Sequence, residues 1–552
     1  MKPNTNNSGP CRLLERTSNA ETRRRGGNVE KSERRTGART LQSEIVKLLI
    51  ACVFLILFHS IADAKPGSGT TRTQSIVKTL HINQPRQTDS RYFYVPFQIG
   101  PHTTKISISY TYDHANGSNA VDIGLFDSRS NLKPGEVEGF RGWSGGRRTE
   151  FFLSQEKATS GYVPGEMPAG TWHIILGLYR VVAQGVDITF KIDVETDESK
   201  ATKLAAATPL SQVFTSNRLA ERKATSRQKE PVFPRWVSGD LHLHTVHSDG
   251  EWTIPELVKA AEDARLDFIC ITDHNTNSHH AEIDGLNLSA DGLVVMRGEE
   301  VTTYGGHANA WGLPPNAWID FRVQPGDSEA MSRIVSQTHR RGALISINHP
   351  FAVCPGCNWS YDGDDNGFDA VEVWNGSWDS SDERALVQWD KLIQEGRRIT
   401  AVASSDSHRP TNPVGQAATH VEINGPLSAT TVLKSLRAGR AYLTSTATAP
   451  AITFEAQTMG DPQTYSIGDV IRLTKSHRIR FKIAASQLPG PATIFLISGG
   501  QIIRTVSPEV GNYQYVEVDS ERNSYFRLEV RDQKGQMLAL TNPIYTESRD
   551  HA

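Results

Sequence analysis

Two separate stretches of the chain alternate apolar and polar residues with a period of two. In the first stretch, 65–198, segments such as 105–110, 120–126 and 186–192 alternate, and turns rich in glycine, asparagine and proline separate them. The stretch 448–552 shows the same pattern. Because no helical period interrupts either stretch, we expect an N-terminal, jelly-roll-like β-sandwich over 65–198 and a second β-sandwich over 448–552.

The stretch between them, residues 235–447, alternates strand and helix patterns. The expected strands are 268–271, 293–296, 343–347, 370–373, 399–403 and 420–423, and the expected helices are 255–265, 328–341, 381–395 and 428–438. This alternation predicts a mostly parallel sheet, either closed as an α/β barrel or open and doubly wound. Residues 199–234, rich in small and charged residues, are expected to be a linker.

The amino-terminal 64 residues combine a basic lead-in with an apolar run at 48–58. That run of 11 residues is shorter than the ~20 that a membrane-spanning helix needs, and it fits the core of a signal peptide. Ala62-Asp63-Ala64 supplies a small-x-small cleavage site. We therefore expect export to the periplasm or the extracellular space. The basic lead-in is longer than an ordinary signal peptide has, so the alternative is an uncleaved signal that attaches the protein to the membrane through residues 46–61.

Composition excludes several classes of protein. The 552 residues, with 59 Lys+Arg against 61 Asp+Glu, suggest about three domains and exclude a polytopic membrane protein and a disordered chain. The formal charge of −2 gives no reason to expect nucleic-acid binding. Five cysteines are too few for a disulfide scaffold. Histidine is the informative residue, because 11 of the 18 lie between His242 and His420.

Candidate metal ligands follow successive strands of the central stretch, at the rim where α/β folds bind ligands. His242 and His244, two residues apart on a strand, point to one face. The whole set has six imidazoles and three carboxylates: His242, His244, Asp249, His274, Glu300, His307, His349, Asp406 and His408. Nine such donors are too many for one Zn²⁺ and suit two or three divalent ions, namely zinc, manganese or iron.

Each of these signals is weak by itself. A lone His-x-His is as often an ordinary pair of histidines, Asp273-His274 could end a strand, and Asn348-His349-Pro350 could be a turn. Nine such side chains at one end of one domain, without a bound ion, would carry a large desolvation cost. The joint pattern therefore favours a metal centre.

The same motifs resemble the PHP (polymerase and histidinol phosphatase) family. The matching segments are His242-x-His244, Ser248-Asp249-Gly250, Thr272-Asp273-His274, Gly298-x-Glu300-Val301, Asn348-His349-Pro350 and Ser405-Asp406-x-His408. The resemblance implies a distorted β/α barrel, up to three metals held by the nine residues above, and a hydrolase, most often a phosphoesterase. The choice of Glu300 over Glu299 rests on the family pattern. The segments 299–309 and 373–376 look most like the CehA/McbA branch, which includes carbaryl hydrolase.

We therefore expect an exported hydrolase that uses a hydroxide bound by several metal ions, most simply on a small-molecule phosphate ester. The alternative is hydrolysis of carbamate or carboxylate aryl esters, and a second alternative is a non-catalytic module that binds glycan or the cell envelope. The aryl-ester alternative is retained because three tryptophans lie near the ligands in the sequence: Trp359, Trp374 and Trp378. The discriminating feature is the lining of the pocket, because cationic residues favour phosphate and aromatic residues favour an aryl group.

Further residues are candidates for binding substrate, orienting ligands or forming a disulfide. The candidates for binding a substrate anion are Arg297, Asn375, Arg409 and Arg440, each of which is at least as well explained by salt bridges or polar contacts on the rim. Asp240 and Asp273 could orient ligand imidazoles. Cys354 and Cys357 predict a local disulfide near the pocket, in preference to a redox motif or half of a zinc site. Five histidines fit no motif: His247, His279, His280, His339 and His420.

Overall fold

The computed structural model describes residues 71–197, Ser199, 234–286, 292–354, 356–361, 367–473, 477–508, 512–520 and 524–548. The basic lead-in, the signal segment with its cleavage site and almost all of the expected linker lie outside these residues. Within the described part of the chain, no helix is both long enough and apolar enough to cross a bilayer.

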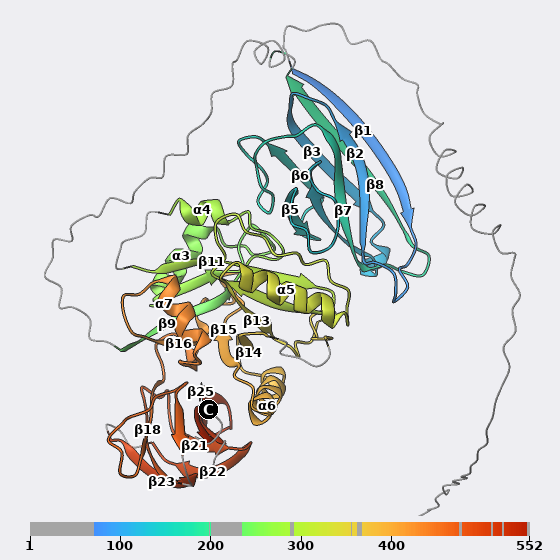
Figure 1. The fold of residues 1–552 in the computed structure, drawn as a ribbon. Coiled ribbons are helices and arrows are strands. Elements are labelled where there is room, and N and C mark those ends of the chain that lie inside the picture. The colour runs from blue at the N-terminus through green and yellow to red at the C-terminus, as the bar shows by residue number, and fades with distance from the viewer. Residues whose placement is uncertain are drawn as a thin grey trace, which may run out of the picture. The chain divides into compact units, whose positions relative to one another are not determined.

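The N-terminal β domain consists of two antiparallel sheets (Figure 1, blue to green). Its strands are β1 (Thr71–Ile82), β2 (Tyr92–Ile99), β3 (Thr103–Tyr112), β4 (Ala120–Phe126), β5 (Phe140–Gly145), β6 (Glu150–Ser154), β7 (Gly170–Arg180) and β8 (Val186–Asp197), with a short 3-10 turn at Ala115–Gly117. One sheet has the order β1-β8-β3-β6 and the other β2-β7-β4-β5. Ile106 and Ile108 of β3 share one apolar core with Val121 and Ile123 of β4, so alternate residues of both sheets are buried between them.

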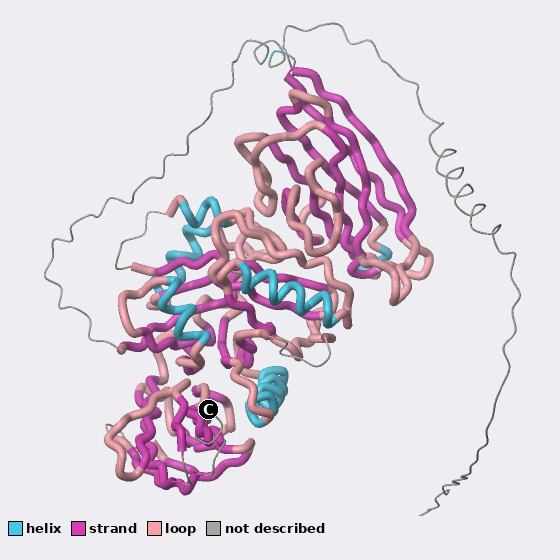
Figure 2. The backbone as a smooth tube through the Cα atoms, in the orientation of Figure 1, coloured by secondary structure: helices cyan, strands magenta, loops and turns pink. Residues whose placement is uncertain are grey.

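The central α/β part has nine strands and five helices in the residues described. The strands are β9 (Arg235–Leu243), β10 (Phe268–Ile271), β11 (Val294–Thr303), β12 (Gly306–Trp311), β13 (Leu344–Asn348), β14 (Ala370–Asn375), β15 (Thr400–Ser404), β16 (Gln416–Ile423) and β17 (Ala441–Thr446). The helices are α3 (Ile254–Asp263), α4 (His280–Asp284), α5 (Ser328–Arg340), α6 (Ser380–Gln394) and α7 (Ala429–Arg437), drawn in cyan in Figure 2.

The sheet of this part is mixed. The strand order is β15-β14-β13-β12-β11-β10-β9-β16-β17. Strands β9, β10 and β11 are parallel, as are β13, β14 and β15, whereas β12 is antiparallel to both of its neighbours and β16 is antiparallel to β9. The tight turn between β11 and β12, at residues 304–305, makes that pair a hairpin, which strand–helix alternation alone does not predict.

The two ends of the strand path from β9 to β15 lie next to each other. The backbone N–H of His244 donates to the carbonyl of Ser407 at 3.0 Å, and Leu243 forms a parallel bridge with Ser407. The segments that follow β9 and β15 are therefore adjacent, although more than 150 residues separate them in the sequence.

Capping residues fix where the helices begin. Thr253 accepts a hydrogen bond from the backbone of Glu256, whose side chain returns to the Thr253 backbone, and Pro255 occupies the first turn of α3. Asp379 forms the same kind of capping box at α6. These caps satisfy backbone N–H groups in the first turn of each helix.

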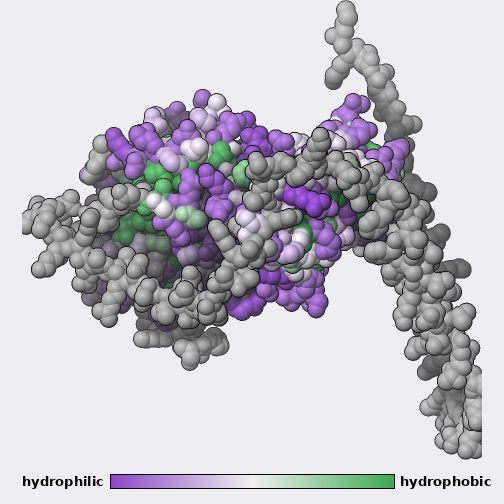
Figure 3. Space-filling model, turned by 90° about the horizontal axis from the view of Figure 1, so that it is seen from above, coloured by the Kyte–Doolittle hydropathy of each residue, from purple (hydrophilic) through white to green (hydrophobic). Residues whose placement is uncertain are grey.

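The C-terminal β part continues the central sheet. Its strands are β18 (Ala451–Thr458), β19 (Val470–Leu473), β20 (His477–Ser486), β21 (Ala492–Ser498), β22 (Gln501–Val506), β23 (Gln514–Ser520), β24 (Ser524–Asp532), β25 (Met537–Thr541) and β26 (Ile544–Ser548). Strands β18, β20 and β23 form a separate sheet, whereas β25 pairs with β17. Without β25, strand β17 would be an exposed edge, so this pairing protects it. On the face drawn in Figure 3, hydrophilic side chains cover most of the described surface.

Aromatic side chains join the N-terminal β domain to the α/β part. Phe140 stacks on Trp318 with ring centroids 3.9 Å apart, and Tyr92 and Trp143 belong to the same buried cluster as Phe321. The buried guanidinium of Arg322 donates to the Tyr94 hydroxyl and to three carbonyls of the β domain. This apolar and hydrogen-bonded contact fixes the β domain against the α/β part.

Candidate metal centre

The nine candidate ligands come from the ends of six neighbouring strands. His242 is on β9 and His244 directly follows it, Glu300 is on β11 and His307 on β12, and the others lie in the segments that follow β9, β10, β13 and β15. Because these strand ends meet at one rim, the structure brings all nine side chains into one connected cluster. Donor atoms of three overlapping groups lie within 4.8 Å of one another: His244, Asp249, His274 and His408; His242, Glu300 and His349; and His242, His244 and Asp406.

Glu300 lies at the centre of this cluster. Its carboxylate oxygens lie 3.2 Å from Nε2 of His242, 2.7 Å from Nδ1 of His274, 3.2 Å from Nδ1 of His307 and 3.3 Å from Nε2 of His349. The Glu300 side chain is almost completely buried. The Nε2 atom of His244 lies 3.5 Å from the same carboxylate. A single carboxylate that faces five imidazoles is placed to bridge more than one ion.

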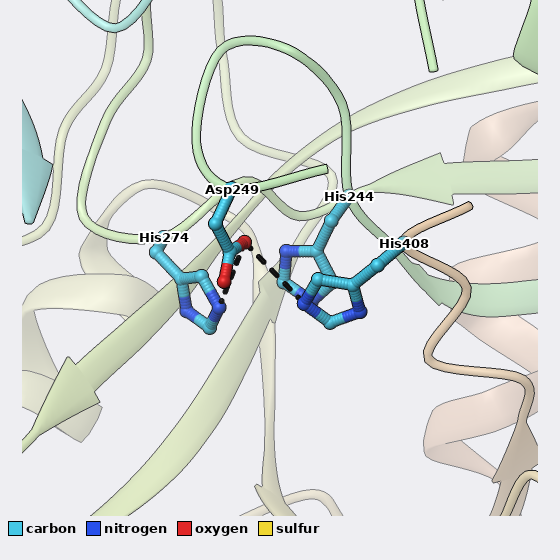
Figure 4. Close-up of side chains that lie close together, drawn as sticks. All are labelled: His244, Asp249, His274 and His408. Atoms are coloured by element: carbon cyan, nitrogen blue, oxygen red, sulfur yellow. Dashed lines mark ion pairs between the residues drawn. The ribbon is translucent and has the colours of Figure 1, made fainter. Parts of the chain in front are cut away.

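Two other carboxylates connect the rest of the cluster. Asp406 Oδ1 lies 3.4 Å from Nε2 of His242 and 3.1 Å from Nε2 of His244. Asp249 Oδ1 lies 3.5 Å from Nε2 of His274 and 3.3 Å from Nε2 of His408. Figure 4 shows the Asp249 carboxylate between the rings of His274 and His408, with His244 beside them. Asp406 thus approaches His244 from the loop after β15, and Asp249 approaches His408 from the loop after β9.

Two of the ligands lie on strained backbone. His349 has a φ of 25° and Asp406 a φ of 51°, in the left-handed region that side chains other than glycine rarely adopt. Each follows the end of a strand and turns its side chain into the cluster. Such strain persists only where the surrounding structure enforces it, and it is concentrated at functional sites.

Charge and burial act in opposite directions on these side chains. Burial opposes the charged form of His242, but Asp406, Glu300 and Glu372 outweigh it and raise the pKa of His242 well above its usual value. Burial also opposes ionisation of Glu300, yet His242, His274 and His307 hold its pKa well below the ordinary range. Burial, helped by the neighbouring His408 and His274, lowers the pKa of His244 to about 4. The cluster therefore combines ionised carboxylates with at least one neutral imidazole.

Glu372, which sequence reasoning missed, holds two of the ligands in place. Its Oε1 lies 3.0 Å from Nδ1 of His242, and its Oε2 accepts the backbone N–H of His349 at 3.0 Å. Glu372 is buried in β14 between Val371 and Val373. A carboxylate in an otherwise apolar strand was the signal that could have found it, because such a group needs a partner when it is buried.

The two aspartates expected to orient imidazoles accept hydrogen bonds from backbone N–H groups instead. Asp240 accepts N–H groups from Ser405 at 3.1 Å and Gly415 at 2.9 Å, which joins β9 to the loop that carries Asp406. Asp273 accepts from the backbone N–H and the hydroxyl of Thr245. The expectation was wrong in this respect, because neither aspartate contacts a ligand imidazole and both order the ligand loops.

The four candidates for anion binding have different surroundings. Asn375 lies at the cluster, where its amide donates to Glu372 at 3.1 Å and to Asp406 at 3.4 Å. Arg409 is exposed, 3.9 Å from Glu251. The structure does not bring Arg297 and Arg440 to the cluster. Arg297 pairs with Asp284.

Arg440 pairs with Glu422 and Asp469. Since Glu422 faces Trp236 at the start of β9, Arg440 lies at the opposite end of the strands from His242. Arg440 therefore has a structural role, because its ion pairs join the α/β part to the C-terminal β part.

A cavity of about 350 Å³ opens onto the cluster. Asp249, His274 and His307 line it from the α/β part, and Trp143, Arg147 and Tyr179 line it from the N-terminal β domain. The three tryptophans named from the sequence do not line this cavity, since Trp374 and Trp378 are buried in the core and Trp359 packs on Tyr361 and Phe368. The aromatic wall is instead built by Trp143, Tyr179 and Tyr304.

Two cysteines lie beside the cavity. Cys354 and Cys357 form a disulfide, as the sequence predicts, and Gly356 and Cys357 line the cavity. Cys270 is a buried free thiol in β10.

Comparison with known proteins gives a family for part of the chain. Residues 240–343 match the model of the PHP domain. None of the curated proteins matches this chain. Similar solved structures include a two-domain protein from Bacteroides vulgatus that contains a predicted PHP-like metal-dependent phosphoesterase. It is 16% identical to this chain, the match covers 56% of this chain and 96% of that one, and the TM-score is 0.32. They also include an amidohydrolase from Chromobacterium violaceum with bound sulfate and no metal, 16% identical over 32% of this chain and 89% of that one, with a TM-score of 0.24.

The segment matched by the family model contains six of the nine clustered side chains: His242, His244, Asp249, His274, Glu300 and His307. Residues 240–343 of this chain are similar to the PHP domain, and they lie in a mixed α/β and β architecture.

Proposed function

We propose that this protein is an exported, metal-dependent hydrolase that acts on a small-molecule phosphate ester. The single observation that carries the proposal is the convergence of six imidazoles and three carboxylates in one cluster, of which Asp249, His274 and His307 line the cavity. As part of this proposal, the seven strands from β9 to β15 close into the distorted barrel expected from the sequence; the hydrogen bond from the His244 N–H to the Ser407 carbonyl supports this closure. The CehA/McbA-like assignment remains part of this proposal.

The residues present fit two or three divalent ions. Several donor atoms are buried without a hydrogen-bond partner in the described residues, among them His242 Nε2, His244 Nε2, Glu300 Oε2 and Asp406 Oδ1. Burying such atoms unpaired is costly, and a cation removes that cost. Two ligand atoms that share one zinc-sized cation lie about 3.0–3.4 Å apart. Three of the four separations between the carboxylates and the Nε2 atoms of His242 and His244, at 3.1–3.4 Å, fall within that spacing, and the fourth, at 3.5 Å, is close to it.

The chemistry of a phosphate ester suits this site. When bound, zinc, manganese or iron ions supply Lewis acidity and lower the pKa of a bound water to about 7. The chain's own residues orient the ligands for this role. Glu372 fixes the ring of His242 through its contact with Nδ1. The hydroxyl oxygen of Thr302 lies 2.5 Å from Nδ1 of His274. The side-chain amide of Asn348 donates to the Glu300 carboxylate at 3.1 Å. The β domain contributes Trp143, Arg147 and Tyr179 to the walls of the cavity beside the cluster.

A second candidate is hydrolysis of an aryl carbamate or aryl carboxylate ester. The observation that favours it is the aromatic lining of the cavity, where Tyr179 and Tyr304 lie with ring centroids 5.6 Å apart and Trp143 lines the same cavity. Aromatic side chains of this kind bind a planar apolar group.

Turnover by metal-reconstituted protein tests both candidates. The substrates are p-nitrophenyl phosphate, bis-p-nitrophenyl phosphate and 1-naphthyl N-methylcarbamate, and Asp406→Asn serves as the inactive control. Hydrolysis of either phosphate ester, abolished in Asp406→Asn, supports the phosphoesterase. Hydrolysis of the carbamate alone moves the assignment to the second candidate. A protein that binds metal but hydrolyses none of the three would refute both and favour a binding module.

A further inference from the structure

The cavity above the metal centre has one wall from a different domain. The turn that follows β5, at Ser144–Arg147, and Tyr179 of β7 belong to the N-terminal β domain, yet they line the same cavity as His274 and His307. The turn is closed by a hydrogen bond from the Arg147 N–H to the Ser144 carbonyl at 3.1 Å. Substrate that reaches the cluster therefore contacts both domains.

Two glycines let this turn approach the cavity closely. Gly145 has a φ of 52°, and a Cβ added to Gly146 would lie 3.3 Å from a carboxylate oxygen of Asp122. Any larger side chain at Gly146 would press on Asp122, which itself lines the cavity. The turn is built to place the next residue, Arg147, at the cavity.

Hydrogen bonds hold the wall in position. Asp122 of β4 accepts from the hydroxyl of Tyr304 at 2.7 Å, across the contact between the β domain and the α/β part. Tyr304 fits here because residue 177 is glycine, since a Cβ at that position would meet the Tyr304 hydroxyl. Arg148 donates to the carbonyls of Ser160 and Val246, which ties the turn to the loop that follows His244.

Arg147 differs from its neighbour Arg148 in having no such partner. Among the described residues, Arg147 has no carboxylate within ion-pair distance, and its side chain is exposed to the cavity and to solvent. Among the described residues that line this cavity, it is also the only lysine or arginine. The other charged groups of the lining, Asp122 and Asp249, are already paired with Tyr304 and with the histidines of the cluster.

We propose that the N-terminal β domain forms the substrate-recognition wall of the active site and that Arg147 binds the phosphoryl group of the substrate. This inference rests on the proposed function. A guanidinium binds phosphate oxygens through paired, charge-assisted hydrogen bonds, and an arginine without an internal partner keeps its donors available for a ligand. Arg147 thereby selects anionic esters over neutral ones.

Binding and turnover are measured on the full metal-loaded chain with Arg147→Ala, Arg147→Lys and the control Arg86→Ala. Arg86 is exposed in the same domain and pairs only with Asp89 in the described residues. In Arg147→Ala we expect the KM for p-nitrophenyl phosphate and the Kd for phenylphosphonate, by titration calorimetry, to rise about tenfold, with kcat changed less than about threefold. Arg147→Lys restores part of the affinity, and Arg86→Ala behaves as the wild type.

The outcomes separate this inference from the proposed function. An Arg147→Ala protein with wild-type affinity for phenylphosphonate overturns the inference, and so does a wild-type protein that does not bind it. An equal loss with the neutral 1-naphthyl N-methylcarbamate also overturns it, because that result indicates a structural role. If the wild type binds phenylphosphonate through Arg147 but hydrolyses no ester, the proposed function fails and the anion site stands.

Discussion

The Nδ1 atom of His242 lies 3.0 Å from Oε1 of Glu372, with both side chains buried. Glu372 is on β14 and His242 on β9, so the contact joins strands 130 residues apart. It fixes which ring nitrogen of His242 is directed toward Glu300 and Asp406. The geometry of the candidate metal centre thus depends on Glu372, which is not one of the nine candidate ligands.

Replacing Glu372 by glutamine tests this role. Glutamine keeps the size of the side chain but removes its charge, so we expect metal affinity to fall about 10- to 100-fold. Competition with a chelating dye measures the change. Glu329→Gln is the matched control, because the Glu329 side chain on α5 is 90% exposed. Equal metal affinity in Glu372→Gln and the wild type would show that Glu372 does not orient His242.

Metal removal should destabilise the protein. An ion that binds only the folded state stabilises it by about 4 kcal/mol when free ion exceeds Kd a thousandfold. We expect EDTA to lower the melting temperature and added Mn²⁺ or Zn²⁺ to restore it, as followed by differential scanning fluorimetry. His349→Ala should respond less to either addition, since it lacks a ligand. An unchanged melting temperature after complete metal removal would argue against a centre that is occupied in the folded state.

The Tyr304–Asp122 hydrogen bond should stabilise the contact between the β domain and the α/β part. Tyr304→Phe leaves the Asp122 carboxyl without the only hydrogen-bond partner that its side chain has in the described residues, and we expect the free energy of unfolding to fall by about 2 kcal/mol. Chemical denaturation measures this. Tyr515→Phe, whose side chain is 63% exposed, should change it by less than about 0.5 kcal/mol. Equal stability of the two variants would contradict the assignment.

His420 should make the protein acid-sensitive independently of the metal centre. Burial lowers the pKa of His420 to about 4, and its ring stacks on Tyr442. Between pH 6.5 and 4 the unfolded chain binds a proton at this histidine while the folded chain does not, so stability is lost as pH falls through that range. The loss is on the order of 3 kcal/mol.

Denaturation curves of the wild type and His420→Gln across that pH range measure this contribution. Glutamine does not titrate, so the variant should lose correspondingly less stability on acidification. Parallel curves for the two proteins would rule out His420 as a source of acid sensitivity.

Sequence reasoning could predict the clustered candidate ligands because each lies in or just after a strand whose apolar pattern is clear. His242 and His349 are examples, and parallel strand ends must meet at one rim. It could not find the wall of the cavity. Arg147 and Tyr179 lie in a domain that no local pattern connects with the metal centre, and their position depends on packing such as that of Phe140 on Trp318. Arg297 was a candidate for binding the substrate, but its side chain pairs with Asp284 instead. Proximity in sequence to Glu300 does not fix the direction of a side chain.

The pairing of β17 with β25 was likewise outside the reach of the sequence. Each strand has an apolar pattern of its own, but neither pattern identifies the strand with which it pairs. Long-range pairing is set by which edges remain unprotected once the rest of the fold has formed.

Elemental analysis of purified protein, by inductively coupled plasma mass spectrometry after dialysis against metal-free buffer, tests the central claim most directly. The wild type should retain two or three equivalents of zinc, manganese or iron per chain. His242→Ala, which removes a donor shared by two of the groups, should retain at least one equivalent less. A folded wild-type protein that retains less than about a tenth of an equivalent after incubation with each ion, and that equals His242→Ala in this respect, would contradict the account.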